Sequence, residues 1–164
     1  GKTTVIEALV ALKHQCFSEV SRAITLEARE KGIEQLFLTD PLLFSKHLLE
    51  KRSQQFLDAE KSNSKLLFFD RGVPDVFAYL NFAKQTHEFN CELIDSENKY
   101  TKIFITPPWK EIYTTDNERF ESYEQAQEIH THIVNTYKKL NYIPITIPKG
   151  TVEERINFIL LNIG

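Results

Sequence analysis

Short apolar runs alternate with helical patterns along this chain of 164 residues. The clearest run is LLFF at 66–69, which is typical of a strand buried on both faces of a parallel sheet. Further strands are expected at 16–18, 102–105 and 142–147. Strands that alternate with helices pair in parallel through right-handed crossovers. The sequence therefore predicts an α/β fold in which helices flank a parallel sheet on both faces.

The segments between these runs carry the signals of helix ends. Gly32 ends a predicted helix over 21–31, because glycine adopts the left-handed turn that closes many helices. Asp40 and Pro41 supply an N-cap and a first-turn proline for the long helix that follows. This pattern predicts one domain over residues 1–164, with ligands bound beyond the carboxyl ends of the strands.

The chain opens on Gly1-Lys2-Thr3-Thr4, the second half of the phosphate-binding loop G-x-x-x-x-G-K-[ST], and a helical apolar pattern follows at once. In the full motif, backbone N–H groups cradle the phosphates, the lysine reaches the β- and γ-phosphates, and the next hydroxyl binds Mg²⁺. The helix N-terminus also favours an anion. These four residues are predicted to bind ATP or GTP, with Thr3 as a ligand of Mg²⁺. The alternative is a solvated turn.

The first half of this motif and the strand that normally precedes it do not occur before Gly1. The sequence also contains no methionine. We therefore expect that an N-terminal strand and the first half of the P-loop are missing from this sequence.

The composition limits the class of protein. Hydrophobic residues make up 41% of the chain, which suits one ordinary core, and the net charge of −3 argues against a broad nucleic-acid surface. No apolar run is long enough to span a membrane and no signal peptide is visible, so a cytoplasmic location is expected. Cys16 and Cys91 are expected to be reduced thiols. The oligomeric state stays open.

Charged residues follow the first two predicted strands. Glu19 comes after the first, and Asp70 and Arg71 come directly after the second. The carboxyl ends of parallel strands share one edge, where Lys2 and Thr3 are also expected. Phosphoryl transfer uses a lysine and Mg²⁺ on the phosphate oxygens, a carboxylate that holds metal or accepts a proton, and arginines for the developing charge. The sequence therefore predicts a phosphoryl-transfer site at this edge.

Each of these side chains has a role in the hypothesis and an alternative. Asp70 is the metal-side carboxylate or the base, and a helix N-cap is the alternative. Glu19 is the other candidate base, and a surface charge paired with Arg22 is the alternative. Arg71 stabilises the transferred phosphoryl group. The residues predicted to bind the acceptor substrate are Glu19, Arg22 and Arg52.

The segment over 107–120 follows the third predicted strand and combines two prolines with mostly polar residues. Ser122 and Gln125 form a capping box that starts the next helix. We predict that the segment is a lid, and that Arg119 moves onto the transferred phosphate as a catalytic cation. The alternative for Arg119 is a solvated loop charge.

Five strings along the chain resemble those of one family. They are GKTT at 1–4, SEVSR at 18–22, FDRGVPD at 69–75, PPW at 107–109 and TDNER at 115–119. They resemble P-loop NTPases of the NadR-like AAA/ATPase domain family, which is related to the ribosylnicotinamide kinase domain of NadR and more distantly to thymidylate and deoxynucleoside kinases. The resemblance covers nearly the whole chain and implies a nucleoside-kinase-like P-loop fold with a lid. It does not imply a substrate.

Two functions follow as predictions. The first is a kinase-like phosphotransferase that uses ATP or GTP and Mg²⁺ to phosphorylate a small hydroxyl-bearing molecule such as a nucleoside. The second is a nucleotide-gated ATPase or binding module that acts on a partner without a small-molecule acceptor.

Overall fold

The computed structural model describes residues 1–113 and 121–163. The chain divides into two compact units, which are considered separately. The first unit comprises residues 1–14 and 100–164, and the second unit comprises residues 15–99. A single domain over 1–164 stays a prediction.

The second unit is built on two short parallel strands. β1 (Gln15–Phe17) pairs with β2 (Leu67–Phe69), and Phe17 lies opposite Phe69. The rings of these two residues stack with their centroids 4.9 Å apart. Strands therefore form at the first two apolar runs, as predicted. Both strands are half-buried rather than fully buried, apart from exposed Gln15.

Five helices complete the second unit. Asp40 caps the longest by accepting a hydrogen bond from the backbone N of Leu43, and Pro41 is its first residue, as predicted. Gly32 follows the helix before it with a φ of 83°, which confirms its predicted role as a helix terminator. The helices are α2 (Ser21–Glu30), α3 (Leu36–Thr39), α4 (Pro41–Glu60), α5 (Val73–Phe82) and α6 (Cys91–Glu97).

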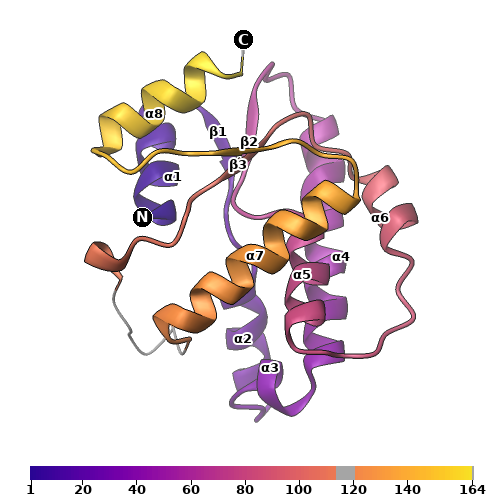
Figure 1. Cartoon of the computed structure of the whole chain (residues 1–164). Helices are drawn as coiled ribbons and strands as arrows, with labels where there is room; N and C mark the ends of the chain where they lie inside the picture. Colours follow the sequence, from indigo (N-terminus) through magenta and orange to yellow (C-terminus); the bar gives the residue numbers. More distant parts are fainter. Residues whose placement is uncertain (114–120, 164) are drawn as a thin grey trace. The chain divides into compact units, whose positions relative to one another are not determined.

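The core of the second unit lies mainly among these helices. Within it, α4 packs against α3 and α5 (Figure 1). Helix α5 contributes most because almost every residue of its first two turns is buried. The core side chains are Ile24, Ala28, Leu36, Leu48, Leu49, Val73, Val76, Phe77 and Leu80.

The first unit contains the other parallel pair. β3 (Ile103–Ile105) pairs with β4 (Pro144–Thr146), with Ile103 opposite Pro144. The capping box predicted at Ser122 is present, and Thr151 forms a second one with Glu154. The remaining elements are α1 (Lys2–Ala11), the 3₁₀ turn η1 (Lys110–Ile112), α7 (Tyr123–Lys139) and α8 (Val152–Leu161).

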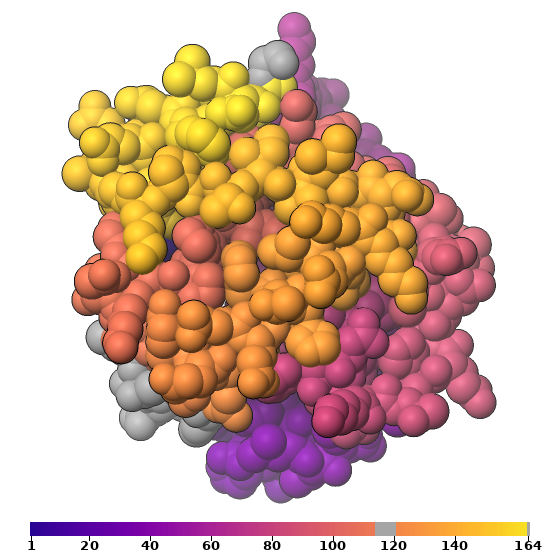
Figure 2. Space-filling view, viewed as in Figure 1, coloured from indigo at the N-terminus to yellow at the C-terminus, as the bar shows by residue number. Residues whose placement is uncertain are grey.

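Helices α1 and α8 lie side by side in the first unit (Figure 1). Val5 and Leu9 form the buried side of α1, whereas Leu12 is exposed. Only part of the predicted apolar face of this helix is therefore buried. Figure 2 shows the outer surfaces of α7 in orange and α8 in yellow.

The parallel pairing of the strands agrees with the predicted fold, but its extent is smaller. Over the described residues, backbone hydrogen bonds join the strands into two separate two-stranded sheets rather than one continuous sheet. Each strand has only three residues, so each ladder is short. The expectation of a parallel sheet with helices on both faces is met only in part. No described helix is both long and apolar enough to cross a membrane.

Candidate functional site

The P-loop residues stand at the beginning of a helix, as the sequence predicts. Gly1 is the N-cap of α1, and Lys2 is the first helical residue. Thr3 and Thr4 are exposed in the first turn. No side chain caps this end of α1 and no acidic residue lies in its first turn. The backbone N–H groups and the helix dipole therefore make this end suitable for an anion.

Arg155 holds the other side of Gly1. Its Nη1 donates a hydrogen bond to the carbonyl oxygen of Gly1 at 3.1 Å, although the two residues are 154 positions apart. Arg155 comes from α8 and is buried. Sequence reasoning missed this residue because nothing in its local pattern distinguishes it from a surface arginine of an amphipathic helix.

The parallel register of β1 and β2 determines where the second group of charges lies. Phe17 is opposite Phe69, so the residues after both strands leave the sheet at the same edge. The backbone N of Asp70 donates to the carbonyl oxygen of Phe17 at 2.8 Å, which extends the ladder by one residue. Glu19 and Arg71 follow, and the structure brings them together as predicted.

Glu19 is shared between two arginines. Its Oε1 accepts a hydrogen bond from Nη2 of Arg52 at 2.9 Å, and its Oε2 lies 2.7 Å from Nε of Arg71. The backbone N–H groups of Val20 and Ser21 also donate to Oε1. Burial raises the pKa of Glu19, but the two guanidiniums and these hydrogen bonds outweigh it, and the pKa lies below its ordinary value. Glu19 is therefore ionised near neutral pH.

Arg52 anchors this arrangement from α4. It is buried, at 3% exposure, and its Nη1 donates to the carbonyl oxygen of Gly72 at 2.9 Å. Its Nη2 holds Glu19. One guanidinium of α4 therefore contacts both Glu19, after β1, and Gly72, in the turn after β2. This geometry gives Arg52 a positioning role. Direct contact between Arg52 and the substrate stays a prediction.

Arg71 adopts a backbone conformation that L-residues rarely take, with a φ of 71°. Three neighbours hold its side chain: Glu19, Asp75 with an Nη1–Oδ1 distance of 3.6 Å, and the ring of Tyr79, whose centroid is 5.5 Å away. Burial alone would lower the pKa of Arg71, but Tyr79 and the carboxylates raise it above its ordinary value. Such strain persists only where the surroundings determine the conformation, and it is common at functional sites.

The helix cap near Asp70 is formed by other residues. Gly72 is the N-cap of α5, and the backbone N of Gly72 donates to Oδ2 of Asp75 at 2.8 Å. The alternative role of Asp70 as an N-cap is therefore wrong, and Asp70 is buried at the end of β2. Sequence reasoning did not assign Asp75 a role, although this residue ends the string FDRGVPD.

The remaining predicted site residues have different outcomes. Glu19 pairs with Arg52 and Arg71 and its side chain is only 19% exposed, so it is not the surface charge of the alternative; its pairing with Arg22 stays a prediction. Arg22 is exposed in the first turn of α2, and its contact with substrate stays a prediction. Arg119 lies outside the described residues, as do positions 114–120 of the predicted lid.

The described part of the predicted lid has defined contacts. Lys149 places its Nζ 3.6 Å from Oε2 of Glu111 and 5.9 Å from the ring centroid of Trp109. The hydroxyl of Tyr113 donates to the carbonyl oxygen of Glu121 at 2.6 Å. These contacts hold Trp109, Glu111 and Tyr113 within the first unit. The contact of Trp109 with Lys149 fits a role in anchoring this loop.

The oxygen donors fit a magnesium ion that is held mainly by phosphate. Among the described residues, no group of three His, Cys, Asp or Glu side chains could hold a metal ion. Mg²⁺ usually keeps several waters and takes one or two protein oxygens together with substrate phosphates, so it does not need such a group. The exposed hydroxyl of Thr3 is a ligand of the right type, and the role of Asp70 as a metal ligand stays a prediction.

The G-K-[ST] end of a phosphate-binding loop at the start of a helix is a feature of P-loop NTPase-like proteins. A family model described as an AAA domain matches residues 1–155, and the chain belongs to this family. Family membership indicates nucleotide binding, generally with Mg²⁺. No curated protein and no solved structure matches the chain significantly.

Proposed function

We propose that the protein is an ATP- or GTP-dependent phosphotransferase that acts on a small hydroxyl-bearing molecule such as a nucleoside. One observation carries the proposal: Glu19, Arg52, Arg71 and Asp75 form a connected ionic cluster beside Asp70, where β1 and β2 end. Buried ionic clusters are costly to a fold, so one at the carboxyl end of parallel strands favours a catalytic role over a structural one.

The nucleotide half of the reaction belongs to the first unit. Gly1 to Thr4 bind the phosphates through their backbone N–H groups, and Lys2 reaches the β- and γ-phosphates. The helix start without a side-chain cap or a first-turn acid supports this role. Thr3 would hold Mg²⁺ together with the phosphates, and the ion would supply charge neutralisation when bound.

The acceptor half belongs to the second unit, where two carboxylates were candidate bases. Glu19 is ionised but already shared by two guanidiniums, and its lowered pKa makes it a weak proton acceptor. We therefore assign the base to Asp70: its carboxylate takes the proton of the acceptor hydroxyl, and the hydroxyl oxygen attacks the terminal phosphorus. The leaving nucleoside diphosphate carries away the electron pair of the broken P–O bond.

The arginines have two separate roles in this proposal. Arg71 neutralises charge on the transferred group, because its raised pKa keeps it protonated throughout. Arg52 positions Glu19 and the turn at Gly72. Arg22 contributes to the acceptor pocket, and Arg119 is a further cation for the transferred phosphate.

One observation favours the second function, a nucleotide-gated module. Arg52 and Arg71 already pair with carboxylates of the protein itself, so the cluster satisfies its own charges without a substrate. In a module of this kind, the cluster would connect elements of the second unit and transfer no phosphoryl group.

A screen of acceptors distinguishes the two functions. Release of ADP or GDP is measured with nucleosides and other small alcohols, for the parent protein and for Asp70→Asn. For the kinase we expect at least one acceptor to raise turnover well above the rate with water, and Asp70→Asn to lower that rate by about 10²-fold or more. Asp58→Asn is the control, because Asp58 is an exposed carboxylate of α4 that pairs with Lys61.

Two other results have definite meanings. Tight nucleotide binding with no response to any acceptor would favour the module. A parent protein that binds neither ATP nor GTP would overturn both functions.

A further inference from the structure

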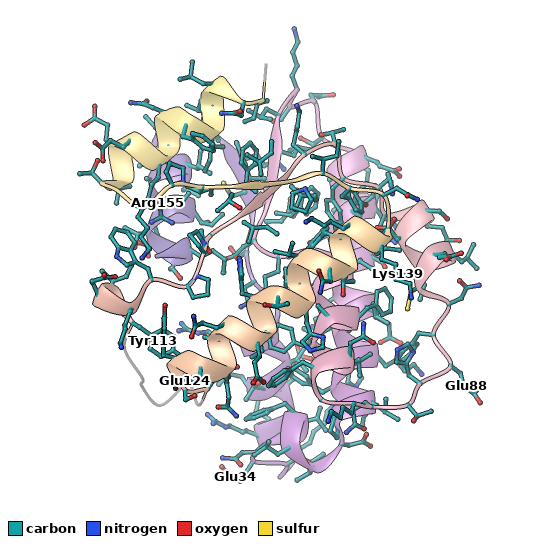
Figure 3. All side chains as sticks on the ribbon, viewed as in Figure 1. Glu34, Glu88, Tyr113, Glu124, Lys139 and Arg155 are labelled. Carbon is teal, nitrogen blue, oxygen red and sulfur yellow. The ribbon has the colours of Figure 1, made fainter. Side chains whose placement is uncertain are left out.

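Tyr79 differs from its neighbours in α5. Over residues 73–80, all of which the structure describes, it is the one residue that is not fully buried. Side chains fill the space between α5 and α4 (Figure 3). Tyr79 lies one turn after Asp75, so both side chains leave the helix on the same face. Tyr79 therefore stands at the edge of the core, on the face of α5 that carries the ionic cluster.

Three groups hold the guanidinium of Arg71, and they do so in two different ways. Oε2 of Glu19 is 2.7 Å from Nε, and Oδ1 of Asp75 is 3.6 Å from Nη1. These carboxylates meet N–H groups, which lie in the plane of the guanidinium. The ring of Tyr79 lies against Cζ instead, with its centroid 5.5 Å away. Two partners in the plane leave the group free to tilt, whereas a ring against its face restricts that tilt.

Nη2 is the end of the guanidinium of Arg71 that the cluster leaves open. Within the part of the chain that the structure describes, this side chain is paired at Nε and Nη1 only. The side chain is 28% exposed, and Nη2 is not among the described buried nitrogens that lack a partner. A ligand can therefore reach Nη2 while the two carboxylates and the ring keep the rest of the group in place.

We propose that Tyr79 is a positioning residue for phosphoryl transfer, and that its ring orients the guanidinium of Arg71 so that Nη2 meets the transferred group. The inference rests on the proposed function, in which Arg71 neutralises charge on that group. The ring is the acting part, because it is the ring that covers the guanidinium. Charge stabilisation depends on groups that are oriented before the reaction, so loss of the ring slows transfer more than it weakens nucleotide binding.

Steady-state kinetics test the role of the ring. Release of ADP or GDP is measured with the acceptor that gives the highest rate in the screen above, for the parent, Tyr79→Phe and Tyr79→Leu. Tyr79→Leu should lower kcat by about tenfold and leave the KM for the nucleotide nearly unchanged. Tyr79→Phe keeps the ring and should retain most of kcat. Tyr123→Leu is the matched control, because Nζ of Lys110 lies 6.0 Å from the ring centroid of Tyr123 in the first unit.

A double-mutant cycle separates positioning from a general structural role. In the Arg71→Gln background, Tyr79→Leu should have little further effect on kcat, because its effect passes through Arg71. An equal loss in both backgrounds would show a structural role and overturn the inference. An unchanged kcat in Tyr79→Leu would also overturn it.

A second measurement covers the case in which Tyr79→Leu does not fold. In the parent protein, NMR should show cross-peaks between the ring protons of Tyr79 and the side-chain protons of Arg71, with Arg71→Lys to assign the signals. Addition of ADP, Mg²⁺ and aluminium fluoride, a mimic of the transferred group, should keep these cross-peaks and shift the Nη signals of Arg71. If the cross-peaks are absent, or if the mimic binds and the Nη signals stay in place, the inference is wrong.

Failure of this inference and failure of the proposed function give different results. Transfer to an acceptor with a normal kcat in Tyr79→Leu overturns the role of Tyr79 alone. A parent protein that transfers to no acceptor overturns the phosphotransferase, and the cross-peaks then decide whether Tyr79 holds Arg71.

Discussion

The carboxylate of Glu19 lies 2.7 Å, measured from Oε2, from Nε of Arg71. This ion pair joins Glu19, which follows β1, to Arg71, which follows β2. Both residues lie at the edge where the two strands end. Arg52 holds the other oxygen of the same carboxylate, so Glu19 is the centre of the cluster.

Replacing Glu19 by Gln should strongly destabilise the protein. The change leaves buried Arg52 and half-buried Arg71 without their shared acid, and loss of one member of a buried pair costs about 3 kcal/mol. The free energy of unfolding from urea titrations measures the loss. Glu27→Gln is the control, because Glu27 forms an exposed pair with Lys51 at 2.7 Å and its loss should cost less than about 1 kcal/mol. Equal losses for the two variants would contradict a special role for Glu19.

The same carboxylate should make stability depend on pH. The pKa of Glu19 is lower in the folded protein than its ordinary value of 4.5, so the unfolded chain binds more protons in this range. The stabilisation is complete above pH 4.5 and is lost as the pH falls through the lowered folded pKa. Unfolding free energies between neutral pH and pH 3 should therefore fall less steeply for Glu19→Gln than for the parent. Parallel curves would show that Glu19 does not contribute.

Because the φ of Arg71 is positive, a variant with glycine at this position should be more stable than one with alanine. This is the reverse of the usual order of stability within a helix. At a φ of 71° alanine is strained by about 1 kcal/mol, whereas glycine is not. Arg71→Gly should therefore be more stable than Arg71→Ala, although both lose the ion pairs. The control is the same pair of substitutions at Arg29 in α2, where alanine should be more stable by about 1 kcal/mol. The same order at both positions would rule out backbone strain at Arg71.

Lys2 should determine nucleotide affinity. Lys2→Ala removes the cation expected on the β- and γ-phosphates, and we expect ATP or GTP to bind about tenfold more weakly or worse. Lys102→Ala is the control, because Lys102 is an exposed lysine of the same unit, next to β3. Calorimetric titration in the presence of Mg²⁺ measures both variants. Equal affinities would remove Lys2 from the site.

Local signals in the sequence were sufficient to predict many of the elements. Asp40 and Ser122 each cap a helix where the pattern indicated, because a cap depends on groups within three residues of one another. The four apolar runs became strands in the predicted order. Gly32 ends α2 for a similarly local reason, since only the conformation of its own backbone matters.

Side-chain burial was less predictable, even within correctly predicted helices. Leu57 is an apolar residue of the correctly predicted helix α4, yet it is 51% exposed. Arg52 of the same helix is buried. The spacing of residues along a helix defines its faces, but the neighbours in space decide which face is covered.

The ionic partners were decided by the tertiary structure alone. The sequence placed Glu19, Asp70 and Arg71 at one edge, because parallel strands bring their carboxyl ends together. It did not reveal that Arg52, 33 positions away, shares Glu19, or that Arg155, 154 positions away, holds Gly1. Contacts between such distant residues depend on how helices pack, and no local pattern of residues encodes that packing. The sequence therefore determined the chemical groups, whereas the tertiary structure decided which groups neutralise one another.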